Sequence, residues 1–286
     1  MGKQLRIWLF VLLGTLFTSS TLLAEGIITM TTSERVGEEI QLIIKANGNV
    51  TIEGAQETGQ ENESGFKPYR LTSQTITIRG DVTELDCNEN QLTSLNVSKN
   101  TALTSLECSY NQLTSLDVSK NTALTKLDCC CNQLISLDVS KNVALTKLAC
   151  FSNQLTSLDV SKNTALEILA CQDNQLKSLD LPKHIALTKL LCSNNKLTSL
   201  NVSGCTRLTF IMCTNNYIKG KAMTKLVNSL PNRRKKSSGT LLVVDCSSQK
   251  RNRNRCSAAD VTTAKRKNWE VLKYRGPYDW VSYSGD

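Results

Sequence analysis

Residues 103 to 123 read Leu103-Thr-Ser-Leu106-Glu-Cys108-Ser-Tyr-Asn111-Gln-Leu113-Thr-Ser-Leu116-Asp-Val118-Ser-Lys-Asn121-Thr-Ala123, and this stretch returns on both sides with the same length. A spacing of 21 residues carries its leucines, cysteine, valine and two asparagines into the next copy. The cysteine recurs at Cys87, Cys108, Cys129, Cys150, Cys171, Cys192 and Cys213. The asparagine three residues later recurs at Asn90, Asn111, Asn132, Asn153, Asn174, Asn195 and Asn216. Such a period is typical of a solenoid, in which each repeat forms one coil and buries its apolar side against neighbouring coils.

The pattern L-x-x-L-x-apolar-x-x-N occurs twice in each coil, once through the cysteine and once through the valine. Alternation in Leu106-Glu-Cys108 and Leu116-Asp-Val118 predicts short strands with their apolar residues inward. We therefore expect a flattened coil with a parallel sheet on each side. The asparagines fall in the turns, where stacked amides can satisfy backbone groups that would otherwise be buried without partners. His184 and Cys205 interrupt the second asparagine series, and we interpret His184, the single histidine, as an adapted turn residue.

The motif L-x-x-L-x-C-x-x-N-x-L, as in Leu145-Thr-Lys-Leu148-Ala-Cys150-Phe-Ser-Asn153-Gln-Leu155, resembles the leucine-rich repeat. The nested form with L-D-V-S-x-N is similar to the internalin-like repeats of exported Bacteroidota proteins. The resemblance is close over residues 76 to 218 and extends to flanking segments such as Val50-Thr-Ile-Glu-Gly54. It implies a surface or secreted protein that binds other macromolecules, often in adhesion or host contact. It implies no particular ligand.

The chain divides into four segments on these patterns. Residues 1 to 24 are expected to be an export signal, residues 25 to 75 an N-terminal β cap, and residues 76 to 218 a leucine-rich repeat solenoid of about 6.5 coils with short parallel strands. Residues 219 to 286 are expected to form a basic α/β cap with two helices and two strands. In the N-terminal cap, residues 47 to 49 read Asn-Gly-Asn, which predicts a hairpin turn.

The export signal is expected because Lys3 and Arg6 precede the apolar run from Ile7 to Phe17, with cleavage near Ala24. The run is short for a membrane span, so we expect no integral membrane segment in the mature protein. A retained N-terminal anchor is the alternative. The expected location is secreted or cell-surface, with the periplasm as a further option, and we find no sorting or wall-anchoring motif near the C-terminus.

The 12 cysteines suggest packing more than covalent cross-linking. The seven periodic cysteines occupy inward apolar positions, and a free cysteine packs as a small hydrophobe. Neighbouring coils hold parallel side chains about 4.8 Å apart, beyond the usual range for a disulfide, so we expect a buried thiol ladder. Cys246 and Cys256 are the one plausible disulfide pair, and whether they are bonded stays open. Residues 129 to 131 are three cysteines pointing inward, outward and into a turn, so we expect no metal site.

The basic charge is concentrated at the C-terminal end, since residues 219 to 286 hold sixteen basic and five acidic residues. Two clusters there could bind a polyanion such as an acidic glycan, lipopolysaccharide or nucleic acid. The alternative is a pair of solvated loops, because no aromatic residues are interleaved to stack on bases. The candidate polyanion-binding residues are Arg233, Arg234, Lys235, Lys236, Arg251, Arg253 and Arg255.

The outward positions of the cysteine strand vary from coil to coil, whereas those of the valine strand stay nearly constant as serine and aspartate or asparagine. One varying column reads Asp86, Glu107, Asp128, Ala149, Ala170, Leu191 and Met212. We expect this face to bind a ligand, acidic toward the first coils and apolar toward the last. The alternative is drift, with the C-terminal cap covering the last positions. The candidate ligand-binding residues are Lys126, Cys130, Lys147, Phe151, Lys189, Leu191, Phe210 and Met212.

The function expected from the residues is non-enzymatic, since neither a G-x-S-x-G motif nor a phosphate-cradling glycine loop is present. We predict a protein-binding or adhesion module that contacts a protein on a host or neighbouring cell, without a cofactor. Polyanion binding through the C-terminal cap is the alternative. The tail residues Tyr278, Trp280 and Tyr283 are either an aromatic binding patch or packing against the last coil.

Overall fold

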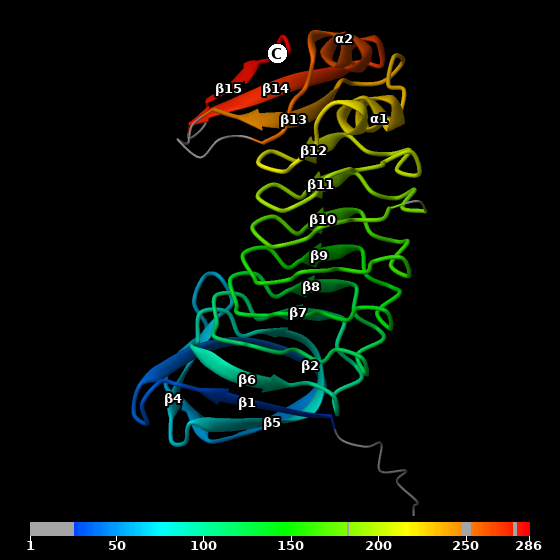
Figure 1. Ribbon diagram of the computed structural model, residues 1–286. Coiled ribbons are helices and arrows are strands. Elements are labelled where there is room, and N and C mark those ends of the chain that lie inside the picture. Colours follow the sequence, from blue (N-terminus) through cyan, green and yellow to red (C-terminus); the bar gives the residue numbers. More distant parts are fainter. Residues whose placement is uncertain (1–25, 182, 247–252, 277–278) are drawn as a thin grey trace, which may run out of the picture.

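A computed structural model describes residues 26–181, 183–246, 253–276 and 279–286. The expected export signal lies outside these residues. In the described part of the chain, no helix has the length and apolar character needed to cross a membrane. The chain winds into a solenoid with one continuous sheet along its length, closed by a β unit at the N-terminal end and an α/β unit at the C-terminal end (Figure 1).

The cysteine strands form the parallel part of this sheet. Each residue of a strand pairs with the residue 21 positions later, so that Leu106 pairs with Leu127 and Leu127 with Leu148. The leucine of each strand, or Ile211 in the last one, and the cysteine that follows it point inward and are buried, as expected. These strands are β7 (Ser105–Glu107), β8 (Lys126–Asp128), β9 (Lys147–Ala149), β10 (Ile168–Ala170), β11 (Lys189–Leu191) and β12 (Phe210–Met212). The fold is therefore the mainly-β leucine-rich repeat solenoid that the 21-residue period predicts.

The valine segments do not form the second parallel sheet that alternation predicted, and that expectation was wrong. Among the described coils they pair with one another only at an isolated bridge between Asp180 and Asn201, and the first of them, β6 (Leu92–Asn96), pairs antiparallel with β1 (Ile27–Thr32) of the N-terminal unit. The Asp117 carboxylate accepts a hydrogen bond from the backbone N–H of Ser119 at 2.8 Å, and the same turn recurs at Asp138 and Asp159. Asp86 and Asp128 form this turn in the paired cysteine strands, so the turn does not by itself prevent pairing.

The asparagines form two hydrogen-bonded ladders, as expected. In the first asparagine ladder, Asn111 Nδ2 donates to the carbonyl oxygens of Cys87 and Cys108, and Asn111 Oδ1 accepts from the backbone N–H of Leu92. In the second, Asn142 donates to backbone carbonyls of the preceding coil. His184 takes the asparagine's place there, because its Nε2 donates to the Val160 carbonyl at 3.0 Å. Each coil is thus tied to its neighbour by buried side-chain amides.

The N-terminal unit is an antiparallel sheet built on β5 (Thr75–Asp86). β2 (Glu39–Glu53) pairs with β5, and β4 (Lys67–Leu71) and β3 (Ala55–Glu57) follow at the edge. β1 (Ile27–Thr32) lies between β5 and β6 (Leu92–Asn96) and pairs antiparallel with both. The end of β5 pairs in parallel with β7, so one strand belongs to both the unit and the first coil.

The hairpin turn expected at residues 47 to 49 is absent, because β2 continues through them as a single strand. The pairing of β2 with β5 shifts register between Asn47 and Thr51. Gly48 takes a positive φ of 101°, which glycine adopts without steric cost. The Asn-Gly-Asn sequence is therefore a bulge inside one strand, since the partner strand holds both flanks in the same sheet.

The C-terminal unit continues the solenoid sheet. β13 (Gly239–Asp245) pairs in parallel with β12, β14 (Trp269–Gly276) pairs in parallel with β13, and β15 (Asp279–Ser282) closes the edge antiparallel to β14. The helices α1 (Lys221–Ser229) and α2 (Ala258–Arg266) connect these strands and contact each other.

The two helices of the C-terminal unit take the place of the valine segments. The Ser229 hydroxyl, at the end of α1, accepts a hydrogen bond from the backbone N–H of Val202 in the last complete coil. Ser257 caps α2 in a reciprocal pair with Asp260, which satisfies backbone N–H groups at the start of the helix. The core therefore extends two strands beyond the last 21-residue repeat.

The first asparagine ladder reaches both end units. At its lower end, the amide of Asn90 bonds the backbone of Gln41 in β2. At its upper end, Asn254 Nδ2 donates to the carbonyls of Cys213 and Val243, and Asn254 Oδ1 accepts from Ile218 N. Asn254 lies in a segment that reads as a basic cluster in the sequence, outside any repeat. It nevertheless serves as one more rung.

All twelve cysteines are free thiols. The seven periodic ones are fully buried, and burial raises the pKa of each, to about 12 for Cys171 and Cys213. Cys246 is exposed and Cys256 buried, and no disulfide joins them. The periodic thiols therefore pack as uncharged apolar groups, as the expected thiol ladder requires.

Candidate binding face

The outward side of the cysteine strands, which we call the sheet face, consists of three columns of side chains. The Ser105 column and the Glu107 column alternate with the inward leucine of each strand. The Cys130 column follows at the point where each strand ends. Lys147 and Lys189 are exposed on this face, whereas Phe151, Leu191, Phe210 and Met212 are half-buried.

Cys130 does not lie on the accessible face, contrary to the outward orientation expected. It is 2% exposed, and burial raises the pKa of its thiol. Its neighbour in the column, Ser109, is also buried and donates its hydroxyl to Asp128 at 2.5 Å. A thiol that is buried in this way cannot contact a partner.

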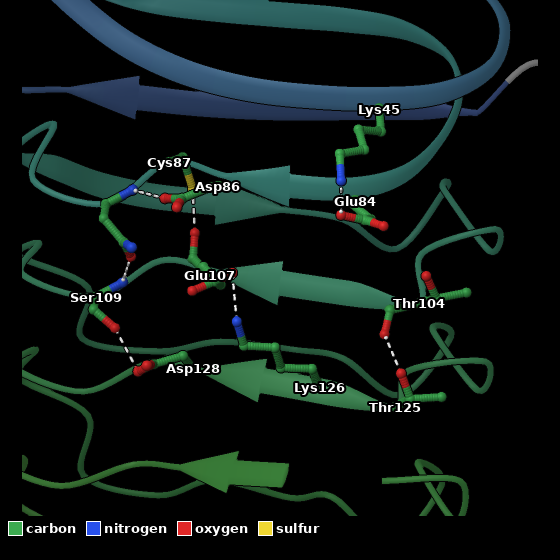
Figure 2. A network of polar contacts seen from close by, with 11 residues as sticks. Lys45, Glu84, Asp86, Cys87, Thr104, Glu107, Ser109, Thr125, Lys126 and Asp128 are labelled. Carbon is green, nitrogen blue, oxygen red and sulfur yellow. Dashed lines mark hydrogen bonds and ion pairs between the residues drawn. The ribbon is translucent and has the colours of Figure 1, made fainter. Parts of the chain in front are cut away.

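The end of the sheet face near the N-terminal unit is acidic. Asp86, Glu107 and Asp128 stand in adjacent strands, and Lys126 donates to Glu107 at 2.7 Å (Figure 2). Burial raises the pKa of Asp86, and the charges of Glu107 and Asp128 add to the increase. Beside them, a cavity of about 420 Å³ is lined by the N-terminal unit and the first strands, including Glu61, Glu63, Glu84 and Ile43.

The other end of the sheet face is aromatic. Trp280 of β15 is 38% exposed, and its ring lies 4.9 Å from that of Tyr274 in β14, centroid to centroid. Together with Met212 these rings line a cavity of about 300 Å³, whose remaining walls carry polar side chains of the last coils. The strands that carry these rings, β14 and β15, extend past the coil loops on one side (Figure 1).

The three aromatic residues of the tail therefore separate. Tyr283 is buried and donates its hydroxyl to Asp286 at 2.5 Å, so its role is to pack inside the C-terminal unit. Trp280 stands on the surface of the cavity, and Tyr278 lies outside the described residues. The sequence did not identify Tyr274 as a site residue, because no motif in the chain indicates that β14 pairs with the solenoid sheet.

The basic clusters do not form one surface. Arg233 is 5% exposed, and its guanidinium donates to the carbonyls of Leu208 and Ser237. Arg234, Lys235 and Lys236 are exposed and come before β13, whereas Arg253 and Arg255 come after it. Arg233 contacts Leu208, which precedes β12, whereas Arg253 lies over Tyr217, which follows it, so the two groups stand at opposite ends of that strand.

Arg253 and Arg255, the second basic group, also contact other side chains. The Arg253 guanidinium lies over the ring of Tyr217, 4.7 Å from the centroid, and Arg255 pairs with Asp286 at 3.6 Å. Arg251 lies outside the described residues. Among the described residues, no group of three or more histidine, cysteine, aspartate or glutamate side chains is arranged to hold a metal ion.

No protein-family model and no curated protein matches the sequence. Among solved structures, the chain is similar to the functional domain of InlJ from Listeria monocytogenes, described as including a cysteine ladder, with 25% identity and a TM-score of 0.33 over 72% of this chain and 56% of that one. It is also similar to a leucine-rich repeat protein of Leptospira interrogans, with 20% identity and a TM-score of 0.49 over 61% of this chain and 44% of that one. The chain thus spans about half the length of either solved protein.

Proposed function

We propose that this chain is an exported, internalin-like module that binds another protein through the sheet face, without catalysing a reaction. The leucine-rich repeat fold is typically a protein-binding module. The main support for this proposal is the contrast between the outward positions of the valine segments and those of the cysteine strands in the same coils. The valine segments carry aspartate or asparagine at the position of Asp117 in every coil, whereas the Glu107 column changes from acid through alanine to leucine and methionine.

Stacking of the coils does not require this change. The strands pair identically from β7 to β12, and the buried leucine and cysteine that hold them together do not vary in kind. A face that is free of structural constraint and differs along its length offers distinct contacts to a partner at each coil. Half-buried Phe151, Leu191 and Phe210 are of the size that anchors protein interfaces.

We expect the double substitution Phe151→Glu and Leu191→Glu to weaken partner binding by on the order of 100-fold, because two apolar anchors of an interface each contribute about 1–2 kcal/mol. The partner is first captured from surface proteins on immobilised residues 26–286, identified, purified and titrated by calorimetry. Urea unfolding is expected to show a loss below about 2 kcal/mol, since both side chains are only half-buried.

The matched control is Ile135→Glu, which makes a similar apolar-to-acid change at a side chain that is 65% exposed on the valine segment. It is expected to bind normally. Equal loss of affinity in this control would show that charge anywhere on the solenoid matters, and unfolding of the double variant would show that Phe151 and Leu191 belong to the core. Either result contradicts the proposal.

Polyanion binding is the second candidate, favoured by the exposed side chains of Arg234, Lys235 and Lys236. Three contacts to phosphate or sulfate predict an affinity loss on the order of 40-fold between 50 and 200 mM salt. For a partner on the sheet face we expect a change below about 5-fold. Titration of heparin and of the captured protein at both salt concentrations separates the two. Replacing the three residues by serine should affect heparin alone.

A further inference from the structure

We propose that the cavity lined by Met212, Tyr274 and Trp280 receives a guanidinium group, the arginine side chain of the protein that occupies the sheet face. The inference rests on the proposed function and names one contact of its partner. We call the cavity the hairpin pocket, because β14 and β15 supply its aromatic wall. Its other lining residues are Gln172, Asp173, Ser193, Asn194, Thr214 and Asp245.

The size and shape of the hairpin pocket suit a single side chain. Its volume of about 300 Å³ stands at the lower limit of small-ligand sites. It lies where the sheet face ends, so a partner that covers the last coils would bring a side chain directly to it. Trp280 remains 38% exposed, although a tryptophan so close to a core is usually covered. An aromatic ring with an open face stacks on a guanidinium plane.

The Asp173 carboxylate gives the hairpin pocket a negative charge. Asn194 Nδ2 donates to Asp173 Oδ1 at 2.7 Å, Asn215 Nδ2 donates to Asn194 Oδ1 at 2.8 Å, and Asn215 Nδ2 also donates to Asp245 Oδ2 at 2.9 Å. This chain of amides holds the Asp173 carboxylate in place, and an amide carries no charge that would neutralise it. Among the described residues, no lysine or arginine forms an ion pair with Asp173.

A further acceptor lines the same pocket. Gln172 Oε1 is buried and has no hydrogen-bond partner in the described part of the chain. Buried acceptors without partners cost free energy, so a ligand with several donors is favoured. A guanidinium carries five N–H donors in a plane and a positive charge, whereas an ammonium has three donors and no plane, and a neutral sugar leaves the Asp173 carboxylate uncompensated.

The test uses N-acetyl-arginine amide as the probe and N-acetyl-citrulline amide, its uncharged analogue, as the control. Both are titrated into isotope-labelled residues 26–286, with the backbone amide signals of Asn194 and Met212 as the readout. We expect saturable shifts at millimolar arginine amide and at least 5-fold weaker binding of the citrulline amide. Equal binding of both compounds would overturn the assignment of a cation, and no shift at either amide would overturn the pocket.

Substitutions sharpen this test. Trp280→Ala and Asp173→Asn are each expected to weaken arginine amide binding about 5-fold, whereas Trp280→Phe retains it because a ring remains. Asp159→Asn is the matched control: it removes the same charge, and Asn96 and Asn201 form the same turn in other coils. Unchanged binding in Asp173→Asn, or equal loss in Asp159→Asn, would overturn the proposal.

The hairpin pocket and the proposed function can fail separately. Phe151 and Leu191 do not line the pocket, so the double glutamate variant should still bind arginine amide. If arginine amide binds but no protein partner is captured, the proposed function is wrong and the guanidinium specificity of the pocket stands. If a partner binds wild type and Trp280→Ala with equal affinity, the pocket is not part of the interface and the inference fails while the function holds.

Discussion

Raising the pH from 8 to 10 is expected to remove about 10 kcal/mol of stability from the folded chain. The seven periodic cysteines are fully buried, and burial raises their pKa well above the ordinary value of 9.0. In the unfolded chain the same thiols ionise near pH 9. Stability that these thiols contribute is therefore complete below pH 9 and is lost as the pH rises toward their folded pKa values.

The magnitude follows from the number of thiols. Between pH 8 and 10 the unfolded state gains about 1.4 kcal/mol per thiol by releasing a proton that the folded state retains. Seven thiols give about 10 kcal/mol, which is comparable with the entire stability of an ordinary domain. Few proteins have so many buried thiols, so most chains change much less over this range.

Urea unfolding at pH 8, 9 and 10 in the presence of a reductant measures this effect. Replacing Cys108 and Cys150 by alanine lowers stability at every pH because cavities remain. It should also reduce the pH-dependent loss by about 3 kcal/mol, since two groups that contribute about 1.4 kcal/mol each are gone. A pH-dependent loss of only about 1 kcal/mol, or the same loss in both proteins, would show that the thiols are accessible in the folded state.

Asn254→Ala is expected to cost about 3–6 kcal/mol and to release the C-terminal unit from the last coil. The substitution leaves the carbonyl of Val243 and the N–H of Ile218 buried without their partner, and it removes one of two amide donors to the carbonyl of Cys213, which keeps its bond from Asn216. Each unsatisfied group costs about 1–3 kcal/mol. These three groups belong to the last cysteine strand, to β13 and to the segment that precedes α1, so the loss falls at one junction.

Limited proteolysis together with thermal unfolding measures this result. The variant should be cut after residue 218 while the preceding coils stay resistant, and a separate early transition should appear. Arg255→Ala, from the same basic cluster, is the control, because its guanidinium is largely exposed and its ion pair with Asp286 contributes little. Similar losses in both variants would show that the cluster acts through its charge and that Asn254 is not a rung.

The sequence predicts well wherever one coil repeats the next. Inward leucine and cysteine, the two asparagine ladders and the role of His184 follow from the 21-residue period, because stacking places equivalent residues side by side. The second sheet was wrongly expected because alternation around Leu116 and Val118 describes burial alone. Whether an extended segment also pairs with the next coil depends on the placement of its backbone N–H and C=O groups, which the side-chain pattern does not describe.

The candidate site was only partly predictable for a similar reason. The sheet face and its change from acid to apolar follow from comparing coils, whereas the burial of Cys130 does not. The aromatic wall of the hairpin pocket comes from β14 and β15, beyond the periodic part. From Met212 to Leu242 and from Leu242 to Leu272 the paired positions are 30 residues apart instead of 21, because a helix takes more residues than an extended segment to cross the same coil.

The sequence by itself determined the solenoid, its buried thiols and the face that varies, because each of these depends on contacts between equivalent residues at a fixed spacing. Tertiary structure alone decided that Asn254 completes a ladder, that Arg233 is buried, and that Tyr274 and Trp280 stand beside Asp173. These residues are brought together by pairing β13 and β14 with the last coil. Such long-range pairing depends on the packing of the whole core, so no local sequence pattern predicts it.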